Sequence, residues 1–291
     1  MKIAVLGAGK MGVWFARFFQ EKGYSVVLAD RKQEKLTQPE KELHIETTTD
    51  FAEAVQCADR VLICVSINAL EEVVKKIGQN IREGQIVMDI CSIKEQPVNI
   101  MHEHIKDGLV LGTHPVFGPG SNGVKHKAYV LTPTNSKEQT YADGFKKWLE
   151  KMGANVFVMS PQKHDQLMTM VLGLPHFLGL AACETLVAEK NFLESKKVAG
   201  TTYRMLFTLA EATALETPDL YANLQTKLPE VQKIEEQFLA YAREWLDLIQ
   251  SKDSEAIFRR MERLKIKLKL SGSDFAKSYE IMYRMLEATE E

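Results

Sequence analysis

Apolar residues in the first half of the chain form short runs, and between these runs apolar positions recur at helical spacing. The runs predict β-strands over residues 2–6, 25–29, 60–65, 85–90, 109–112, 128–132 and 155–159. The intervening stretches predict helices over residues 12–22, 50–56, 69–80, 96–104 and 137–152. This alternation is typical of βαβ units, so we predict an α/β fold with a doubly wound parallel sheet. Ligands of such sheets bind at the carboxyl ends of the strands.

Helical periodicity takes over after Met159. Ser160 and Pro161 are typical of an N-cap followed by the first turn of a helix, and we predict no strand beyond them. The chain is therefore expected to have two domains, an α/β domain over residues 1–160 and an all-α domain over residues 161–291.

One apolar run, residues 167–188, approaches the length of a membrane span. Gly173 and Pro175 interrupt it, and His176 and Glu184 would be costly in hydrocarbon. We therefore predict no membrane span and assign the run to a helix buried between domains or subunits. Because one small helical domain cannot cover this run and the later amphipathic helices, we expect a homodimer.

Composition excludes several classes of function. A formal net charge of −2 over 291 residues removes the electrostatic argument for nucleic-acid binding, which needs a concentrated basic face. The N-terminus opens directly into a strand-like run without the cleavage site of a signal peptide. The four cysteines show neither a metal-ligand spacing nor a disulfide framework, and they are Cys57, Cys64, Cys91 and Cys183. We therefore expect a cytoplasmic protein without a metal.

A glycine-rich turn, Gly7-Ala8-Gly9-Lys10-Met11-Gly12, follows the first predicted strand and opens a helix. In this context the pattern is typical of a Rossmann-type dinucleotide-binding domain. Gly7 permits the tight turn, Gly9 lets the backbone approach the pyrophosphate, and Gly12 lets the helix lie close to the strand. A glycine-rich turn without a cofactor is the alternative.

Asp30 closes the second predicted strand at the spacing of the acidic residue that binds the adenosine ribose. It favours NAD, because a carboxylate repels the additional phosphate of NADP. Arg31 and Lys32 follow and could offset that repulsion, so NADP stays open; otherwise they form a solvated turn. Ser66 ends a later strand, where it either approaches the nicotinamide or caps the next helix. The predicted cofactor contacts are Gly7, Gly9, Lys10, Met11, Gly12, Asp30, Arg31 and Ser66.

His114 lies between a predicted strand end and a segment, residues 115–120, in which prolines and glycines hold a loop in one shape. A histidine mounted in this way is a candidate general base. Ser92 ends the neighbouring strand at the same edge, and it is a candidate partner that fixes the tautomer of His114. A structural or exposed histidine is the alternative.

The segment Gly112-Thr113-His114-Pro115-Val116-Phe117-Gly118-Pro119 closely resembles the signature of the prephenate and arogenate dehydrogenases of tyrosine biosynthesis. Asp89-Ile90-Cys91-Ser92-Ile93-Lys94 resembles the segment with the serine that partners the family's catalytic histidine. Similar helical motifs are His164-Asp165, Leu174-Pro175-His176, Tyr203-Arg204 and Thr217-Pro218-Asp219-Leu220-Tyr221. The resemblance covers roughly residues 1 to 225.

The resemblance implies an oxidative decarboxylation of prephenate, with arogenate as the alternative substrate. The C4 hydroxyl of the cyclohexadienyl acid would lose its proton to His114, hydride would pass to NAD or NADP, and loss of carbon dioxide would form the aromatic ring. Arg204 is the candidate contact to the substrate carboxylate, His176 could contact the substrate or the cofactor, and Lys94 is an alternative anion contact. A surface ion pair for Arg204 and a core role for His176 are the alternatives. The family's second substrate arginine is missing, since the corresponding positions hold Thr208, Glu211 and Ala212.

Two other classes share parts of this pattern. A β-hydroxyacid dehydrogenase or imine reductase has the same two-domain plan, but those hydroxyacid enzymes rely on a lysine in the first interdomain helix, and residues 164–189 contain none. A redox-sensing module that binds a dinucleotide and signals through oligomerisation is the alternative outside catalysis.

Overall fold

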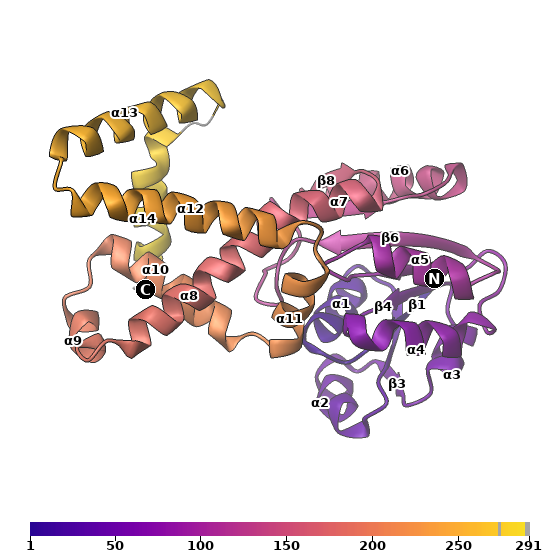
Figure 1. The fold of residues 1–291 in the computed structure, drawn as a ribbon. Helices are drawn as coiled ribbons and strands as arrows, with labels where there is room; N and C mark the ends of the chain where they lie inside the picture. The colour runs from indigo at the N-terminus through magenta and orange to yellow at the C-terminus, as the bar shows by residue number, and fades with distance from the viewer. Residues whose placement is uncertain (273–274, 289–291) are drawn as a thin grey trace. The chain divides into compact units, whose positions relative to one another are not determined.

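The computed structural model describes residues 1–272 and 275–288, which fold into two compact units (Figure 1). The first unit comprises Met1–Met168 and Lys227–Pro229, and the second comprises Thr169–Thr226 and Glu230–Glu291. Each unit is described by itself below.

An eight-stranded sheet with the order β3-β2-β1-β4-β5-β6-β7-β8 forms the first unit. Its strands are β1 (Lys2–Leu6), β2 (Ser25–Ala29), β3 (Glu46–Thr48), β4 (Arg60–Ile63), β5 (Ile86–Asp89), β6 (Leu109–Pro115), β7 (Ala128–Thr132) and β8 (Asn155–Val158). Strands β1 to β6 are parallel, whereas β7 pairs antiparallel with β6. A parallel crossover needs about a dozen residues and usually a helix. Residues 116–127 form no helix, so the chain turns back, and the sheet is mostly rather than wholly parallel.

Helices cover both faces of this sheet, which confirms the predicted α/β class. One face carries α1 (Lys10–Glu21), α2 (Gln33–Leu43) and α6 (Ser136–Lys151), and the other carries α3 (Phe51–Gln56), α4 (Ile67–Gly78) and α5 (Glu95–His104). Side chains alternate between the faces, so Ile3 and Val5 join the core under α1, while Ala4 and Leu6 join the opposite core. Strands buried on both faces read as continuous apolar runs. That is why the sequence marks them clearly.

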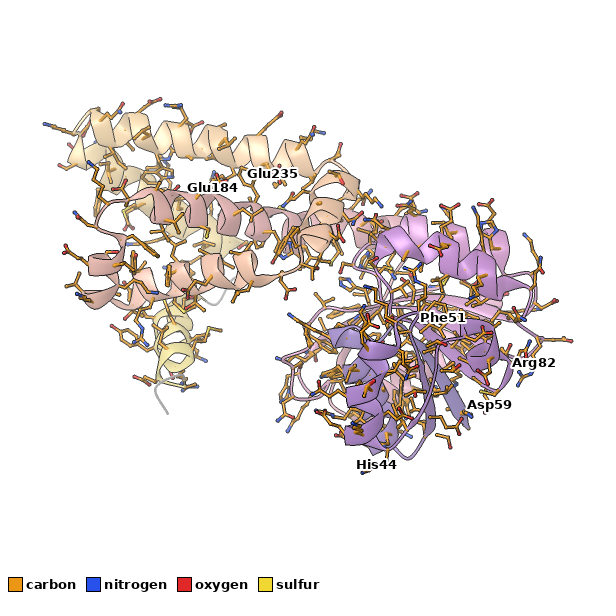
Figure 2. All side chains as sticks on the ribbon, turned by 90° about the horizontal axis from the view of Figure 1, so that it is seen from below. His44, Phe51, Asp59, Arg82, Glu184 and Glu235 are labelled. Atoms are coloured by element: carbon orange, nitrogen blue, oxygen red, sulfur yellow. The ribbon has the colours of Figure 1, made fainter. Side chains whose placement is uncertain are left out.

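Two elements of this unit were not predicted. β3 has only three residues, none of them buried, and α2 contains Pro39 and few apolar side chains. Neither therefore has the hydrophobic period on which the prediction depends. Figure 2 shows Phe51 of α3 pointing into the interior of the unit, while His44, Asp59 and Arg82 lie at its surface.

The second unit is helical throughout its described residues, as predicted. One turn of π-helix (Thr169–Gly173) leads into α8 (Leu174–Ala188), and the following helices are α9 (Phe192–Lys197), α10 (Thr201–Leu215), α11 (Pro218–Lys227), α12 (Val231–Gln250), α13 (Ser254–Leu270) and α14 (Ser278–Glu287). α8 and α10 pack closely because Gly179 faces Thr213, where any Cβ would overlap the threonine side chain. α7 (Pro161–Met168) belongs to the first unit.

Much apolar surface of the helical unit is uncovered. Within α8 only Gly179 is buried, and Leu180 and Val187 are 39% and 58% exposed. By length and composition alone, the helical run Pro161–Ala188 could cross a membrane, and 11% of its most apolar window is buried in this chain. One such helix is weak evidence for a membrane span, since the core helix of a soluble protein passes the same test, but a core helix is mostly buried. The burial predicted for residues 167–188 is not found within the described chain.

Candidate active site

Two of the three glycines of the turn between β1 and α1 are required by backbone packing. Gly7 has a φ of +109°, and a Cβ there would lie 2.7 Å from the carbonyl oxygen of Cys64. A Cβ on Gly12 would overlap the carbonyl oxygen of Gly7. A Cβ on Gly9, in contrast, would meet no heavy atom within 4 Å. The space in front of Gly9 is therefore not filled by protein, as a closely approaching pyrophosphate requires.

The N-terminus of α1 faces this same space. Gly9 is its N-cap and provides no side-chain hydrogen bond, and its first turn, which contains Lys10 and Met11, holds no acidic residue. The first N–H groups of a helix lack partners within the helix, and they favour an anion. These residues therefore fit the phosphates of a dinucleotide.

Asp30 follows the end of β2 beside the turn and is 9% exposed. Its Oδ2 accepts a hydrogen bond from the Ala8 N–H at 2.9 Å, and its Oδ1 accepts one from the Lys32 N–H at 3.0 Å. A carboxylate has about four acceptor positions, so lone pairs remain for ribose hydroxyls. Arg31 instead forms an ion pair of 3.1 Å with Glu72 of α4.

Ser66 is the N-cap residue of α4 by position, but its hydroxyl makes no capping hydrogen bond. It is exposed. The predicted role of Ser66 as a helix cap is therefore not seen in the structure, and its predicted approach to the nicotinamide stays a prediction.

His114 lies within β6, opposite Val130 of β7, and not on a loop after the strand as the sequence had indicated. The strand continues through Pro115 because residues 112–115 pair with residues 129–132 of β7. The local sequence around His114 does not show this pairing, since its partners lie elsewhere in the chain. A strand is a more rigid mounting than a loop. The side chain is 4% exposed.

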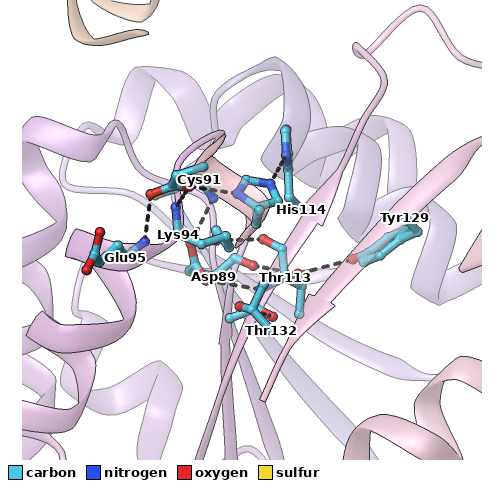
Figure 3. A network of polar contacts seen from close by, with 11 residues as sticks. Asp89, Cys91, Lys94, Glu95, Thr113, His114, Tyr129 and Thr132 are labelled. Atoms are coloured by element: carbon cyan, nitrogen blue, oxygen red, sulfur yellow. Dashed lines mark hydrogen bonds and ion pairs between the residues drawn. The ribbon is translucent and has the colours of Figure 1, made fainter. Parts of the chain in front are cut away.

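A chain of hydrogen bonds orients His114 (Figure 3). Its Nδ1 lies 2.8 Å from Nε2 of His164, and Nδ1 of His164 lies 2.7 Å from Oδ1 of Asp165. A carboxylate only accepts, so the Nδ1–H of His164 donates to Asp165, and the Nε2 of a neutral His164 must accept. His114 then donates through Nδ1, which leaves the lone pair on its Nε2. That nitrogen can take a proton.

Both imidazoles favour the neutral form. Burial, with smaller contributions from His164 and the Lys94 ammonium, lowers the pKa of His114 well below its ordinary value. Burial also lowers the pKa of His164, although the hydrogen bond to Asp165 acts in the opposite direction. His114 is therefore available as a base at neutral pH.

Ser92 is half-buried after β5, and no hydrogen bond from it to His114 occurs among the residues that the structure describes. His164, and not the predicted Ser92, is the hydrogen-bond partner of His114 in the structure. The pair His164-Asp165 was noticed only as a motif, because its partner lies 50 positions earlier in the chain.

Lys94 is a correction to the prediction of a substrate contact. Its side chain is fully buried, and its Nζ pairs with Oδ2 of Asp89 and donates to the carbonyl oxygen of Thr113 at 2.7 Å. Asp89 also accepts hydrogen bonds from the Cys91 and Thr113 N–H groups. Because these partners hold it inside the protein, the Lys94 ammonium has no surface to offer to a substrate carboxylate.

His176 and Arg204, the other predicted substrate contacts, belong to the second unit. The His176 ring packs edge to face on Tyr221 at 4.3 Å, and burial lowers its pKa to about 4. Its Nδ1 is buried and has no hydrogen-bond partner among the described residues. Arg204 lies half-buried on α10. Among residues 1–272 and 275–288, no group of three or more histidine, cysteine or acidic side chains could hold a metal ion.

The fold and the glycine turn define a nucleotide-binding α/β protein with a helical second domain. Profiles of known families match this class: "Prephenate dehydrogenase, nucleotide-binding domain" matches residues 15–158, and "Prephenate dehydrogenase, dimerization domain" matches residues 160–263. The chain belongs to the prephenate/arogenate dehydrogenase family. The family inferred from the histidine-proline segment is thereby confirmed.

Individual relatives agree. A probable arogenate/prephenate dehydrogenase of Methanocaldococcus jannaschii is 36% identical over 261 residues, which cover 88% of this chain and 58% of that protein. The chain spans 37% to 58% of the length of several curated relatives that it matches.

Solved structures share the fold. A prephenate dehydrogenase from A. aeolicus, in complex with hydroxyphenyl propionate and NAD+, has a TM-score of 0.76 at 23% identity and covers 92% of this chain and 96% of that chain. The arogenate dehydrogenase of Synechocystis has a TM-score of 0.69 at 21% identity and covers 93% of this chain and 98% of that one.

Gly12→Ala and Gly9→Ala should separate packing from cofactor binding. The Cβ at position 12 overlaps backbone, so this variant should lose about 1–3 kcal/mol of stability in urea unfolding. The Cβ at position 9 meets only open space, so this variant should unfold like the wild type but bind NADH more weakly in a fluorescence titration. Unchanged NADH affinity in Gly9→Ala would show that no phosphate approaches this turn.

Proposed function

We propose that this chain is a prephenate dehydrogenase that oxidises and decarboxylates prephenate to 4-hydroxyphenylpyruvate, with arogenate as the alternative substrate. One observation carries the proposal: His114 is buried, neutral and held in the tautomer that leaves Nε2 free to accept a proton. It lies near the carboxyl end of β6, at the edge of the sheet where the glycine turn follows β1. Family membership supplies the substrate class.

In this reaction His114 holds and returns one proton. Its Nε2 accepts the proton of the C4 hydroxyl, while the C4 hydrogen leaves with its electron pair. The nicotinamide, when bound, supplies the acceptor for that hydride. The bond to the ring carboxylate then breaks, carbon dioxide departs, and the electron pair reaches the ring oxygen, which takes the proton back from His114. A positioned histidine contributes about 10²–10⁴-fold to such a transfer.

We assign the substrate carboxylate to Arg204, through a bidentate contact, and a further substrate contact to His176. A ligand acceptor or donor would satisfy the His176 Nδ1, which otherwise has no partner among the described residues. Thr208, Glu211 and Ala212 stand where the family's second arginine is expected, so Arg204 has no such companion there. Ser92 and Ser66 remain proposed polar contacts at the same edge as His114.

We propose NAD as the preferred cofactor. Asp30 places a carboxylate at the ribose position, where it would repel an additional phosphate, and Arg31 pairs with Glu72 at the surface. The scattered cysteines, all of them free, suit a reducing cytoplasm.

A matrix of two substrates against two cofactors tests the proposed activity. Prephenate with NAD+ should give the highest kcat/KM, measured as absorbance at the NADH wavelength, and the product should be 4-hydroxyphenylpyruvate. NADP+ should be the poorer cofactor because of charge repulsion at Asp30. An absence of turnover in all four combinations would refute the assignment.

Replacing His114 with Asn should lower kcat with prephenate about 10²–10⁴-fold and leave the Kd for NADH unchanged. The wild type should lose kcat/KM only as pH falls through the lowered pKa of His114, so the acid limb should lie below pH 6.5, its ordinary value. Asp165→Asn should also lower kcat, because an amide, which can donate as well as accept, no longer selects one tautomer of His164 and through it of His114. An acid limb at or above pH 7 would contradict this role for His114.

We further propose that the helical unit forms a homodimer. The profile for its sequence is a dimerization domain, and Leu180 and Val187, two turns apart on one face of α8, are exposed. Covering them by a second copy would remove apolar surface from water.

Light scattering at micromolar concentration should therefore give twice the chain mass of 33.0 kDa. The double variant Leu180→Glu/Val187→Glu should shift the protein towards monomer. Phe157→Glu, at an equally exposed apolar side chain of β8, is the matched control and should remain dimeric. A monomeric wild type would disprove the dimer.

A further inference from the structure

A cavity of about 450 Å³ lies at the amino ends of the sheet strands, whereas the glycine turn lies at their carboxyl ends. Its volume falls in the range of sites for small molecules. All of its lining residues belong to the first unit, and they are Tyr24, Arg60, Lys137, Thr140, Tyr141, Gly144, Phe145 and Trp148. Tyr24 precedes β2 and Arg60 begins β4, so the cavity lies at the amino ends of these strands. The five residues of β1 separate the two edges by about 16 Å.

Aromatic rings form the wall of this cavity. The rings of Phe145 and Trp148 stack with their centroids 5.5 Å apart, and those of Tyr141 and Phe145 stack with their centroids 6.1 Å apart. Tyr24 contacts Trp148 at 6.1 Å. These side chains give the cavity an apolar, aromatic lining, which favours an aromatic ring as ligand.

The charges at the cavity are all positive. Arg60 and Lys137 line it, no acidic residue does, and neither cation has a carboxylate partner in the described part of the chain. The Arg60 guanidinium lies 5.4 Å from the centre of the Tyr141 ring, and it donates no hydrogen bond within the described part of the chain. An anion would satisfy both side chains.

The Tyr141 hydroxyl is a further polar group that lacks a partner. Its oxygen is buried and makes no hydrogen bond to the residues described. Burial raises the pKa of Tyr141 to about 12, so the group keeps its proton and can donate. Leaving such a group unpaired is costly, and a ligand acceptor would remove that cost.

Gly144 keeps the cavity open from the middle of α6. Glycine is the least favourable helix residue after proline. Packing does not require it here, since a Cβ would meet no heavy atom within 4 Å. Its effect is to leave space beside the aromatic wall.

We propose that this cavity binds a small aromatic carboxylate, with the ring against Tyr24 and Trp148 and the carboxylate on Arg60 and Lys137. The Tyr141 hydroxyl donates to the ligand. Because β1 separates this cavity from the glycine turn, binding is independent of the dinucleotide, and the inference does not rest on the proposed function.

Fluorine NMR of the full-length protein labelled with 5-fluorotryptophan tests the site, with 4-hydroxyphenylacetate as the probe. The Trp148 resonance should shift saturably, with and without NAD+, while the resonance of Trp245, in α12 of the second unit, serves as the internal reference. Gly144→Leu should abolish the shift by filling the space, and Arg60→Gln should weaken affinity at least tenfold. Lys147→Gln, an exposed residue of the same helix that does not line the cavity, is the matched control and should bind normally.

Absence of a saturable Trp148 shift at millimolar probe would overturn the proposal. So would a shift that survives Gly144→Leu in a protein whose thermal unfolding is unchanged. Equal affinity for the uncharged analogue p-cresol would disprove the role of the two cations. None of these outcomes depends on turnover, so failure here leaves the dehydrogenase assay unaffected.

Discussion

The carboxylate of Asp165 is the interaction on which the geometry of the candidate site depends. It accepts the Lys94 and Glu95 N–H groups at the start of α5, at 2.7 and 3.0 Å, and the Nδ1–H of His164. A carboxylate at a helix N-terminus is favoured by the helix dipole. The same group that anchors α5 to α7 therefore dictates which nitrogen of His164 accepts, and through it which nitrogen of His114 is free. Asp165 therefore both holds α5 in place and determines which nitrogen of His114 carries the proton.

A second buried interaction, the ion pair of Lys94 and Asp89, holds the ends of β5 and β6 next to the hydrogen bonds of His114, His164 and Asp165. Asp89 closes β5 and accepts the Thr113 N–H, while Lys94 donates to the Thr113 carbonyl, so both polar groups of the residue before His114 are held. Removing one partner of a buried pair leaves an unpaired charge, which typically costs 3–5 kcal/mol. The ammonium also contributes to the lowered pKa of His114. The pair therefore acts on His114 through position and through charge, although it lies outside the reach of a substrate.

The sequence predicts this fold well where burial is continuous along the chain and poorly where it depends on partners far away. β1, β2 and β7 have the predicted bounds, because their apolar runs record burial on both faces. β3 is too short and exposed for that signal. The continuation of β6 through His114 depends on β7, and the tautomer of His114 depends on His164, fifty residues away. Lys94 was predicted to be an anion contact, and the sequence did not show that its side chain is fully buried, which is rare for lysine. Only the position of Asp89 shows that its charge is neutralised inside.

A histidine with a lowered pKa is a weak base, and the proposed reaction explains why a weak base suffices. Proton transfer is most efficient when the pKa of the base lies near the working pH, so lowering it sacrifices some driving force. In the proposed reaction the proton is only held while hydride and carbon dioxide leave, and the product ring oxygen takes it back. A base that bound the proton strongly would delay that return. The free energy comes from aromatisation, and the protein supplies what the small molecule lacks: a neutral imidazole, locked in one tautomer, at a fixed place on a strand.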